Sequence, residues 1–234
     1  MKPKTATPPI PVCATCEKPP ELCFCAEITP HAPKTKVLIL QHPQEPDKRL
    51  GTARLLQLSL KDSVLRVGLS WPNLGKALGS PAGAPINPKE WAVLYLGSGI
   101  KLEAGRRKPP PGTLTFVNKK SQPWPPTYDE AGIRAQLKGI VLLDGTWSQA
   151  KALWWRNAWL LKLNRAILTP PRRSLYGKLR KEPRPECLST LETAAYALTA
   201  LGDTAEHEAK LLAVFSRLLK LSQPTPKAAP EIPV

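Results

Sequence analysis

The segment from Gly139 to Lys151 carries the strongest chemical signal of the chain. An apolar, β-branched run ends at Asp144, and a glycine and a helical pattern follow it. This order is typical of a buried strand that leads into a helix, and ligands of open α/β sheets bind at the carboxyl ends of such strands. Asp144 is therefore a candidate for catalysis or ligand binding. Because Asp, Thr and Ser also cap helices, the local residues favour a helix-capping role equally.

Four cysteines near the amino terminus form a second candidate site. Cys13, Cys16, Cys23 and Cys25 follow the spacing C-x2-C-x6-C-x-C. Four neighbouring thiolates satisfy tetrahedral zinc, and a site with four protein ligands has no open position for catalysis. Disulfides require an oxidising compartment, and the spacing is not one of the common ferredoxin patterns. We therefore expect structural zinc here, and we expect the fifth cysteine, Cys187, to be a small buried side chain.

The formal net charge of +16 is concentrated in one region of the chain. Residues 151–184 contain ten lysines and arginines and a single acid, Glu182. Such a concentration favours a polyanionic partner, because neutralising phosphates releases counterions, although a merely solvated basic face is the plainer interpretation. Nucleic acid is the partner that we expect. Its predicted contacts are Lys151, Arg172, Arg173, Arg180 and Lys181.

The hydrophobic pattern predicts an α/β domain that presents these residues. Strands are predicted at 37–40, 64–69, 91–96, 114–117, 139–143 and 166–168, and helices at about 47–60, 129–137, 147–161, 189–201 and 204–220. Their alternation predicts a mostly parallel sheet with helices on both faces. Capping boxes are predicted at Ser189–Glu192 and Asp203–Glu206. For Glu192, a catalytic role is the alternative to capping.

The domain organisation follows from composition. Residues 1–12 and 222–234 are rich in proline and are expected to be disordered tails. Residues 13–35 form the expected zinc-binding appendage, and residues 36–221 form the main domain. The apolar runs are too short to span a bilayer and the amino terminus carries no apolar signal segment, so we expect a cytoplasmic protein with no membrane partner.

From about residue 13 to residue 215 the chain resembles the DTW-domain family. The family is named for an Asp, a Thr and a Trp, which are matched here by Asp144, Thr146 and Trp147. Other blocks fit the family in the expected order, together with the cysteine cluster. These blocks are Gln41–Glu45, Thr52–Leu56, Leu94–Tyr95, Ser174–Pro183 and Leu188–Ala194.

The resemblance implies a fold and an activity. DTW-domain proteins are similar to the SPOUT class, whose carboxy-terminal chain forms a trefoil knot that binds S-adenosylmethionine. The implied reaction transfers the 3-amino-3-carboxypropyl group of S-adenosylmethionine to N3 of a uridine in tRNA and releases methylthioadenosine. An RNA methyltransferase on the same scaffold and a non-enzymatic, zinc-containing RNA-binding protein are the alternatives. No DNA partner is expected, and the oligomeric state is not predicted.

The resemblance also assigns roles to residues. Asp144 is expected to accept the N3 proton, or alternatively to orient the cationic sulfur of the cofactor. Trp147 is expected either to stack on a base or on adenine, or to pack in the core, and His42 either to serve the site or to form a structural hydrogen bond. Arg180 and Lys181 are expected to hold the cofactor carboxylate or phosphate. The expected cofactor-binding residues are Tyr95, Gly97, Asp144, Gly145, Thr146, Trp147, Leu188, Ser189 and Thr190.

Overall fold

A single six-stranded sheet forms the centre of the protein. The computed structural model describes residues 11–45, 49–81, 84–94, 99–102, 107–125, 127–180, 184 and 186–223. The sheet has the order β2-β1-β5-β3-β6-β4, and every pair is parallel except β4–β6. The mostly parallel sheet is therefore confirmed. Its strands are β1 (Lys36–Gln41), β2 (Val64–Val67), β3 (Trp91–Leu94), β4 (Leu114–Val117), β5 (Gly139–Asp144) and β6 (Asn164–Leu168).

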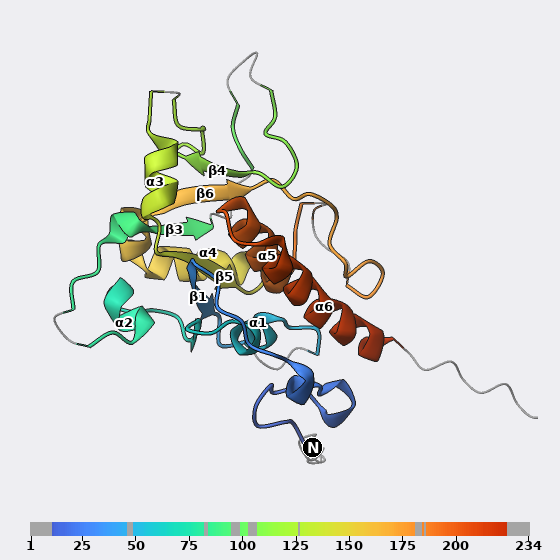
Figure 1. Ribbon diagram of the computed structural model, residues 1–234. Helices are drawn as coiled ribbons and strands as arrows, with labels where there is room; N and C mark the ends of the chain where they lie inside the picture. The colour runs from blue at the N-terminus through green and yellow to red at the C-terminus, as the bar shows by residue number, and fades with distance from the viewer. Residues whose placement is uncertain are drawn as a thin grey trace, which may run out of the picture.

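Helices cover both faces of the sheet, as the sequence predicts (Figure 1). Helices α1 (Ala53–Ser59), α5 (Thr190–Ala200) and α6 (Ala205–Ser222) share one hydrophobic cluster with alternate residues of β1, Val37 and Ile39. Helices α2 (Leu74–Leu78) and α4 (Trp147–Arg156) share the other with Leu38 and Leu40. Helix α3 (Glu130–Gln136) lies beside β4 at the edge of the sheet. Side chains alternate across a strand, so β1 contributes to both layers.

Two helix predictions differ from the structure in extent. The helix predicted from residue 47 begins at Ala53, and residues 46–48 lie outside the described part. The helix predicted over 147–161 ends at Arg156, and a 3-10 helix follows at Ala158–Lys162. The break lies at the fully buried Asn157, whose amide donates to the carbonyls of Leu69 and Leu153. A buried amide needs such partners, and they hold this residue outside helical geometry.

One of the two predicted capping boxes is wrong. Ser189 and Glu192 form a complete box at the start of α5. At α6 the residue before the helix is Thr204, and no side chain caps it. Asp203 is instead buried, and its carboxylate accepts the backbone N–H of Lys34 at 2.8 Å. The tertiary contact to the chain entering β1 therefore replaces the local cap.

The cysteine-containing segment packs on the main domain beside α1 and the end of α6 (Figure 1). Leu22 and Phe24 are buried in the same cluster as α5 and α6, so the appendage has no separate core. The predicted tails fall largely on residues 1–10 and 224–234, which lie outside the described part. Among the described residues, no helix combines the length and apolarity needed to cross a membrane.

The buried His31 makes stability depend on pH. The ring of His31 lies 4.6 Å from that of His207, with Asp203, Glu206 and Lys210 close by. Burial, and then the charges of His207 and Lys210, lower the pKa of His31 below its usual 6.5, while Glu206 opposes this. The unfolded chain therefore binds this proton more readily, so stability is complete above about pH 6.5 and declines as the pH falls below it.

We expect His31→Gln to reduce this decline, because Gln carries no titrating proton. Melting temperatures of both proteins between pH 8 and 5 measure the effect. Equal slopes in the wild type and the variant would contradict the assignment to His31.

Candidate active site and metal centre

A cavity of about 430 Å³ lies at the carboxyl ends of β3, β5 and β6. Its walls also include the segment before α1, the first turns of α4 and α5, and parts of the loop between β6 and α5. Sites for small organic ligands usually have volumes of about 300 to 1,000 Å³. The position agrees with the rule that ligands of open α/β sheets bind at the carboxyl edge.

Asp144, like Glu45, is a buried acid in the described wall of this cavity. It ends β5 in register with Gln41 at the end of β1, and it is 7% exposed. Its Oδ2 accepts the side-chain amide of Gln41 at 2.7 Å, and its Oδ1 accepts the hydroxyl of Thr190 at the start of α5. Both donors are uncharged, and each carboxylate oxygen keeps a further lone pair for a ligand.

Of the two roles that the sequence leaves open for Asp144, the cap of α4 is wrong. The N-cap is Thr146, which forms a complete capping box with Gln149. Gly145 turns the chain between strand and helix with φ at +150°, and an added Cβ would approach Gln149 to 2.9 Å. A glycine is therefore required at this turn. The turn leaves the Asp144 side chain directed to Gln41 and Thr190.

Most of the predicted cofactor-binding residues line the cavity. Tyr95 and Gly97, and also Lys181 of the predicted RNA contacts, lie outside the described residues, so their positions stay predictions. Leu94 and Gly99, on either side of the first two, do line the cavity. The predicted residues found in the wall, besides Asp144, are Gly145, Thr146, Trp147, Leu188, Ser189, Thr190 and Arg180.

Trp147 lies in the cavity wall among cations and is half-buried. The guanidinium of Arg184 lies 4.8 Å from its ring centroid and the ammonium of Lys151 lies 5.6 Å away. These distances are within the range of cation–π contacts. The predicted RNA contacts Arg172 and Arg173 are exposed and do not line the cavity.

Three other candidates have clear positions. Glu192 is fully buried and accepts hydrogen bonds from Ser189, Ser174 and the N–H of Leu175, so its role is structural. His42 accepts the N–H of Gln44 at 3.3 Å and does not line the cavity. Cys187, expected to be buried, is half-buried and forms part of the cavity wall.

Several residues of the site carry no role in the sequence analysis. Thr52 lines the cavity and accepts the N–H of Leu191 at 3.3 Å. Lys18, 3% exposed, extends from the cysteine segment to the chain before α1. Burial lowers the pKa of Lys18 to about 8, and the charge of Asp144 partly opposes this. The sequence could have indicated a site role for Gln41, because Gln41 follows a predicted strand whose end lies at the same edge of the sheet as Asp144. No feature of the neighbouring sequence indicates such a role for Lys18.

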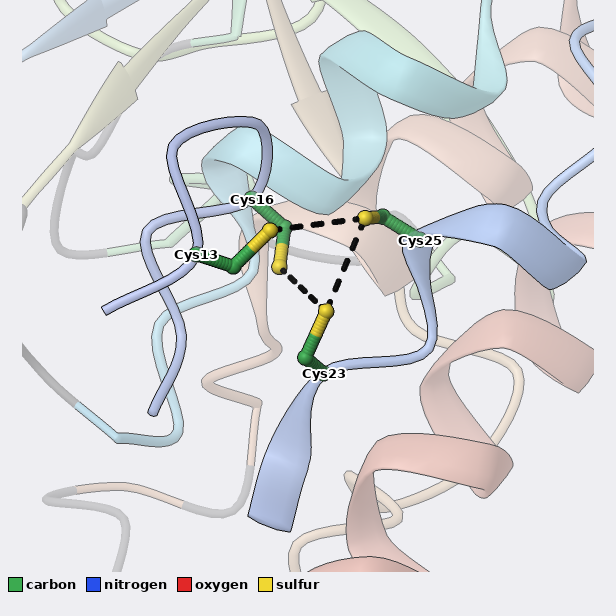
Figure 2. A group of neighbouring side chains, drawn as sticks. All are labelled: Cys13, Cys16, Cys23 and Cys25. Atoms are coloured by element: carbon green, nitrogen blue, oxygen red, sulfur yellow. Dashed lines mark hydrogen bonds between the residues drawn. The ribbon is translucent and has the colours of Figure 1, made fainter. Parts of the chain in front are cut away.

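The four cysteines form a cluster that fits one tetrahedral metal ion. Figure 2 shows their sulfur atoms gathered around a common centre, and all four lie within 4.8 Å of one another. Sulfur–sulfur distances are 3.7 Å for Cys13–Cys25 and 3.6 Å for both Cys16–Cys23 and Cys23–Cys25. Zinc–sulfur bonds of about 2.3 Å in a tetrahedron require sulfur atoms about 3.8 Å apart. The donor set and its spacing therefore fit zinc.

The thiols of Cys13 and Cys16 differ in acidity. Backbone N–H groups of Cys16 and then Thr15 lower the pKa of Cys13 to about 6, so that this thiol ionises at neutral pH. Burial raises the pKa of Cys16 to about 12. A metal ion must therefore displace a proton from Cys16, because thiolate is the form that binds zinc.

The fold and the site define an α/β protein with a small-ligand cavity at its strand ends and a four-cysteine centre beside it. The chain belongs to the DTW domain family, whose model matches residues 10–223. No solved structure is significantly similar to it.

The chain is similar to several proteins that are named tRNA-uridine aminocarboxypropyltransferases. The tRNA-uridine aminocarboxypropyltransferase 2 of Drosophila melanogaster is 31% identical over 219 residues, covering 89% of this chain and 73% of the relative. That of Macaca fascicularis is 28% identical over 193 residues, covering 82% of this chain and only 56% of the relative. The tRNA-uridine aminocarboxypropyltransferase A of Arabidopsis thaliana is 28% identical over 250 aligned residues, covering 92% and 85%.

Replacing Cys13 and Cys23 together by serine should remove bound zinc and lower the melting temperature. The purified wild type should carry about one zinc per chain, because four thiolates saturate one tetrahedral ion. Metal analysis measures both proteins, and Cys187→Ser, outside the cluster, is the matched control that should keep its zinc. A doubly substituted protein with an unchanged zinc content would refute the assignment.

Proposed function

We propose that this protein transfers the 3-amino-3-carboxypropyl group of S-adenosylmethionine to N3 of a uridine in tRNA. The observation that carries the proposal is the Asp144 carboxylate, fixed by two neutral donors in the wall of a cavity of cofactor size. Membership of the DTW domain family and the names of the relatives support the same reaction.

The proposed reaction needs one proton acceptor, and the Asp144 carboxylate would serve as that acceptor. Asp144 takes the N3 proton of uridine, and N3 forms a bond to the side-chain methylene next to sulfur. The carbon–sulfur bond breaks with its electron pair going to sulfur, so the cationic sulfonium becomes neutral methylthioadenosine. Asp144 then releases its proton to water. The negative carboxylate also favours the sulfonium in the ground state, which is the alternative role expected for this residue.

The proposal assigns the cavity to the cofactor and the basic surface to tRNA. Gly145, Thr146, Trp147, Leu188, Ser189 and Thr190 would hold S-adenosylmethionine, with Tyr95 and Gly97 from the neighbouring loop. Lys151, Arg172, Arg173, Arg180 and Lys181 would contact tRNA. Between Gly145 and Arg180 the chain contains no acid, which supports a phosphate-facing surface.

The remaining parts of the proposal are a SPOUT-like knot, structural zinc and a cytoplasmic location. The knot is supported by the return of the chain after β6 across the strand ends, where Tyr176 donates to the carbonyl of Leu50 and Thr190 donates to Asp144. Zinc is supported by the fit of the four sulfur atoms and would fold the cysteine segment without taking part in the reaction. The cytoplasm is where tRNA and reduced cysteines occur together.

Asp144→Asn should abolish most of the transfer while the protein stays folded. The amide keeps the size of the side chain and partners for Gln41 and Thr190, so stability should fall by no more than about 1 kcal/mol. Loss of the proton acceptor should slow single-turnover transfer by roughly a hundredfold or more. Mass spectrometry of tRNA nucleosides follows the product and distinguishes aminocarboxypropyl from methyl transfer.

The matched control is Asp129→Asn, because Asp129 caps α3 away from the cavity. It should transfer at the wild-type rate. A wild-type rate in Asp144→Asn would exclude the proposed role of that carboxylate.

Arg173→Ala should flatten the dependence of tRNA affinity on salt by about one log–log unit, if its guanidinium neutralises one phosphate. Arg172→Ala is the comparison. The guanidinium of Arg172 already donates to the hydroxyl of Tyr196 at 2.8 Å and lies 4.0 Å from Glu208, so its removal should change the slope less. Binding at several salt concentrations measures both slopes. An unchanged slope for Arg173→Ala would show that it meets no phosphate.

A further inference from the structure

The cavity wall before α1 is held by side chains rather than by regular structure. Three successive carbonyls, of Arg49, Leu50 and Gly51, each accept a hydrogen bond from a distant side chain. Lys18 donates to Arg49 at 3.0 Å and to Gly51 at 2.6 Å, and Tyr176 donates to Leu50 at 2.7 Å. Gly51 and the adjoining Thr52 line the cavity. The position of this wall therefore depends on Lys18 and Tyr176.

The fold of the cysteine segment sets the position of Lys18. The backbone N–H of Cys13 donates to the carbonyl of Lys18 at 2.8 Å, and that of Glu17 donates to Cys13 at 2.8 Å. Glu17 adopts a φ of +57°, and its carboxylate pairs with Arg54 of α1. This tight loop lies between the ligand Cys16 and Pro19, and it directs Lys18 inward, where only 3% of the residue is exposed.

A buried ammonium is costly unless it is fully hydrogen-bonded, so a surface role does not explain this lysine. An ammonium has three donors and no acceptor, which suits the capture of carbonyl groups from an irregular segment. Without Lys18, the carbonyls of Arg49 and Gly51 would both lose their side-chain donor, and the contact that ties this segment to the cysteine loop would be gone.

We propose that Lys18 is a positioning residue that couples the folded cysteine cluster to the cofactor cavity. The cysteine loop holds Lys18, Lys18 holds the carbonyls of Arg49 and Gly51, and Gly51 lines the cavity that Asp144 also lines. The inference rests on the proposed function in taking the cavity as the S-adenosylmethionine site. It gives the four-cysteine centre a second effect besides folding, because loss of the metal would loosen this wall.

The test compares two substitutions that each remove one positive charge. Lys18→Met removes the donors and keeps an unbranched apolar chain. Arg49→Met is the matched control, because the Arg49 side chain pairs with Glu21 at the surface and only its backbone carbonyl meets Lys18. Measurements are zinc content, the dissociation constant for S-adenosylmethionine by calorimetry, and hydrogen–deuterium exchange over residues 50–53.

Lys18→Met should keep its zinc, bind S-adenosylmethionine roughly tenfold more weakly, a change that corresponds to about 1.4 kcal/mol, and exchange faster over residues 50–53. At saturating cofactor its single-turnover rate should stay within about threefold of the wild type, because Asp144 keeps its hydrogen bonds to Gln41 and Thr190. Arg49→Met should match the wild type in every measurement. Wild-type affinity and exchange in a zinc-containing Lys18→Met would overturn the proposal.

If Lys18→Met does not fold, removal of zinc from the wild type by a chelator replaces it. Faster exchange over residues 50–53 with weaker cofactor binding supports the coupling, and unchanged values in zinc-free protein overturn it. If the wild type binds no S-adenosylmethionine, the proposed function fails, while the exchange of residues 50–53 in Lys18→Met still decides whether Lys18 holds the wall.

Discussion

The carboxylate of Asp144 is the point on which the arrangement of the site depends. Gln41 reaches it from β1 and Thr190 reaches it from α5, so one side chain joins two central strands and the helix that follows the long loop. A buried carboxylate must be hydrogen-bonded, and this need fixes the positions of its partners as firmly as it fixes the acid. Both partners are neutral, so the charge of Asp144 is not cancelled by a direct ion pair. A carboxylate held in this way keeps its capacity to attract a cation or a proton.

The walls of the cavity depend on a second buried carboxylate. Glu192 is fully buried and receives donors from Ser174, Leu175 and Ser189, which tie the loop after β6 to the first turn of α5. The same loop carries Tyr176, which reaches the chain before α1. Irregular segments separated by more than a hundred residues are thus joined by polar side chains. A cap that looks local in sequence therefore also supports the cavity.

Local patterns in the sequence predict the elements and the chemical groups well. The strand that ends at Asp144, the box at Ser189–Glu192 and the cysteine spacing all depend on residues within a few positions of one another. The long-range contacts could not be predicted in the same way. Nothing near Lys18 indicates that its ammonium meets Gly51, and nothing near Asn157 indicates that its amide ends α4. For the same reason the sequence could not decide between Asp144 and Thr146 as the cap, because both residue types cap helices and only the fold separates them.

The size of the cavity constrains how the proposed substrates meet. A volume of about 430 Å³ suits one small ligand, so a folded RNA must stay on the surface and present a single base at the opening. Lys151 and Arg184 lie against the ring of Trp147 in the cavity wall, where their charges would meet the phosphates beside the presented base. The N3–H of uridine is the donor that pairs with adenine in a duplex, so a paired uridine could not yield this proton to a carboxylate. The proposed reaction therefore requires a uridine that is unpaired or turned out of its helix. Under this proposal, recognition of the tRNA would come from the shape and phosphates around that nucleotide, and the segment from Gly145 to Arg180, which has basic residues and no acid, has the charge to meet them.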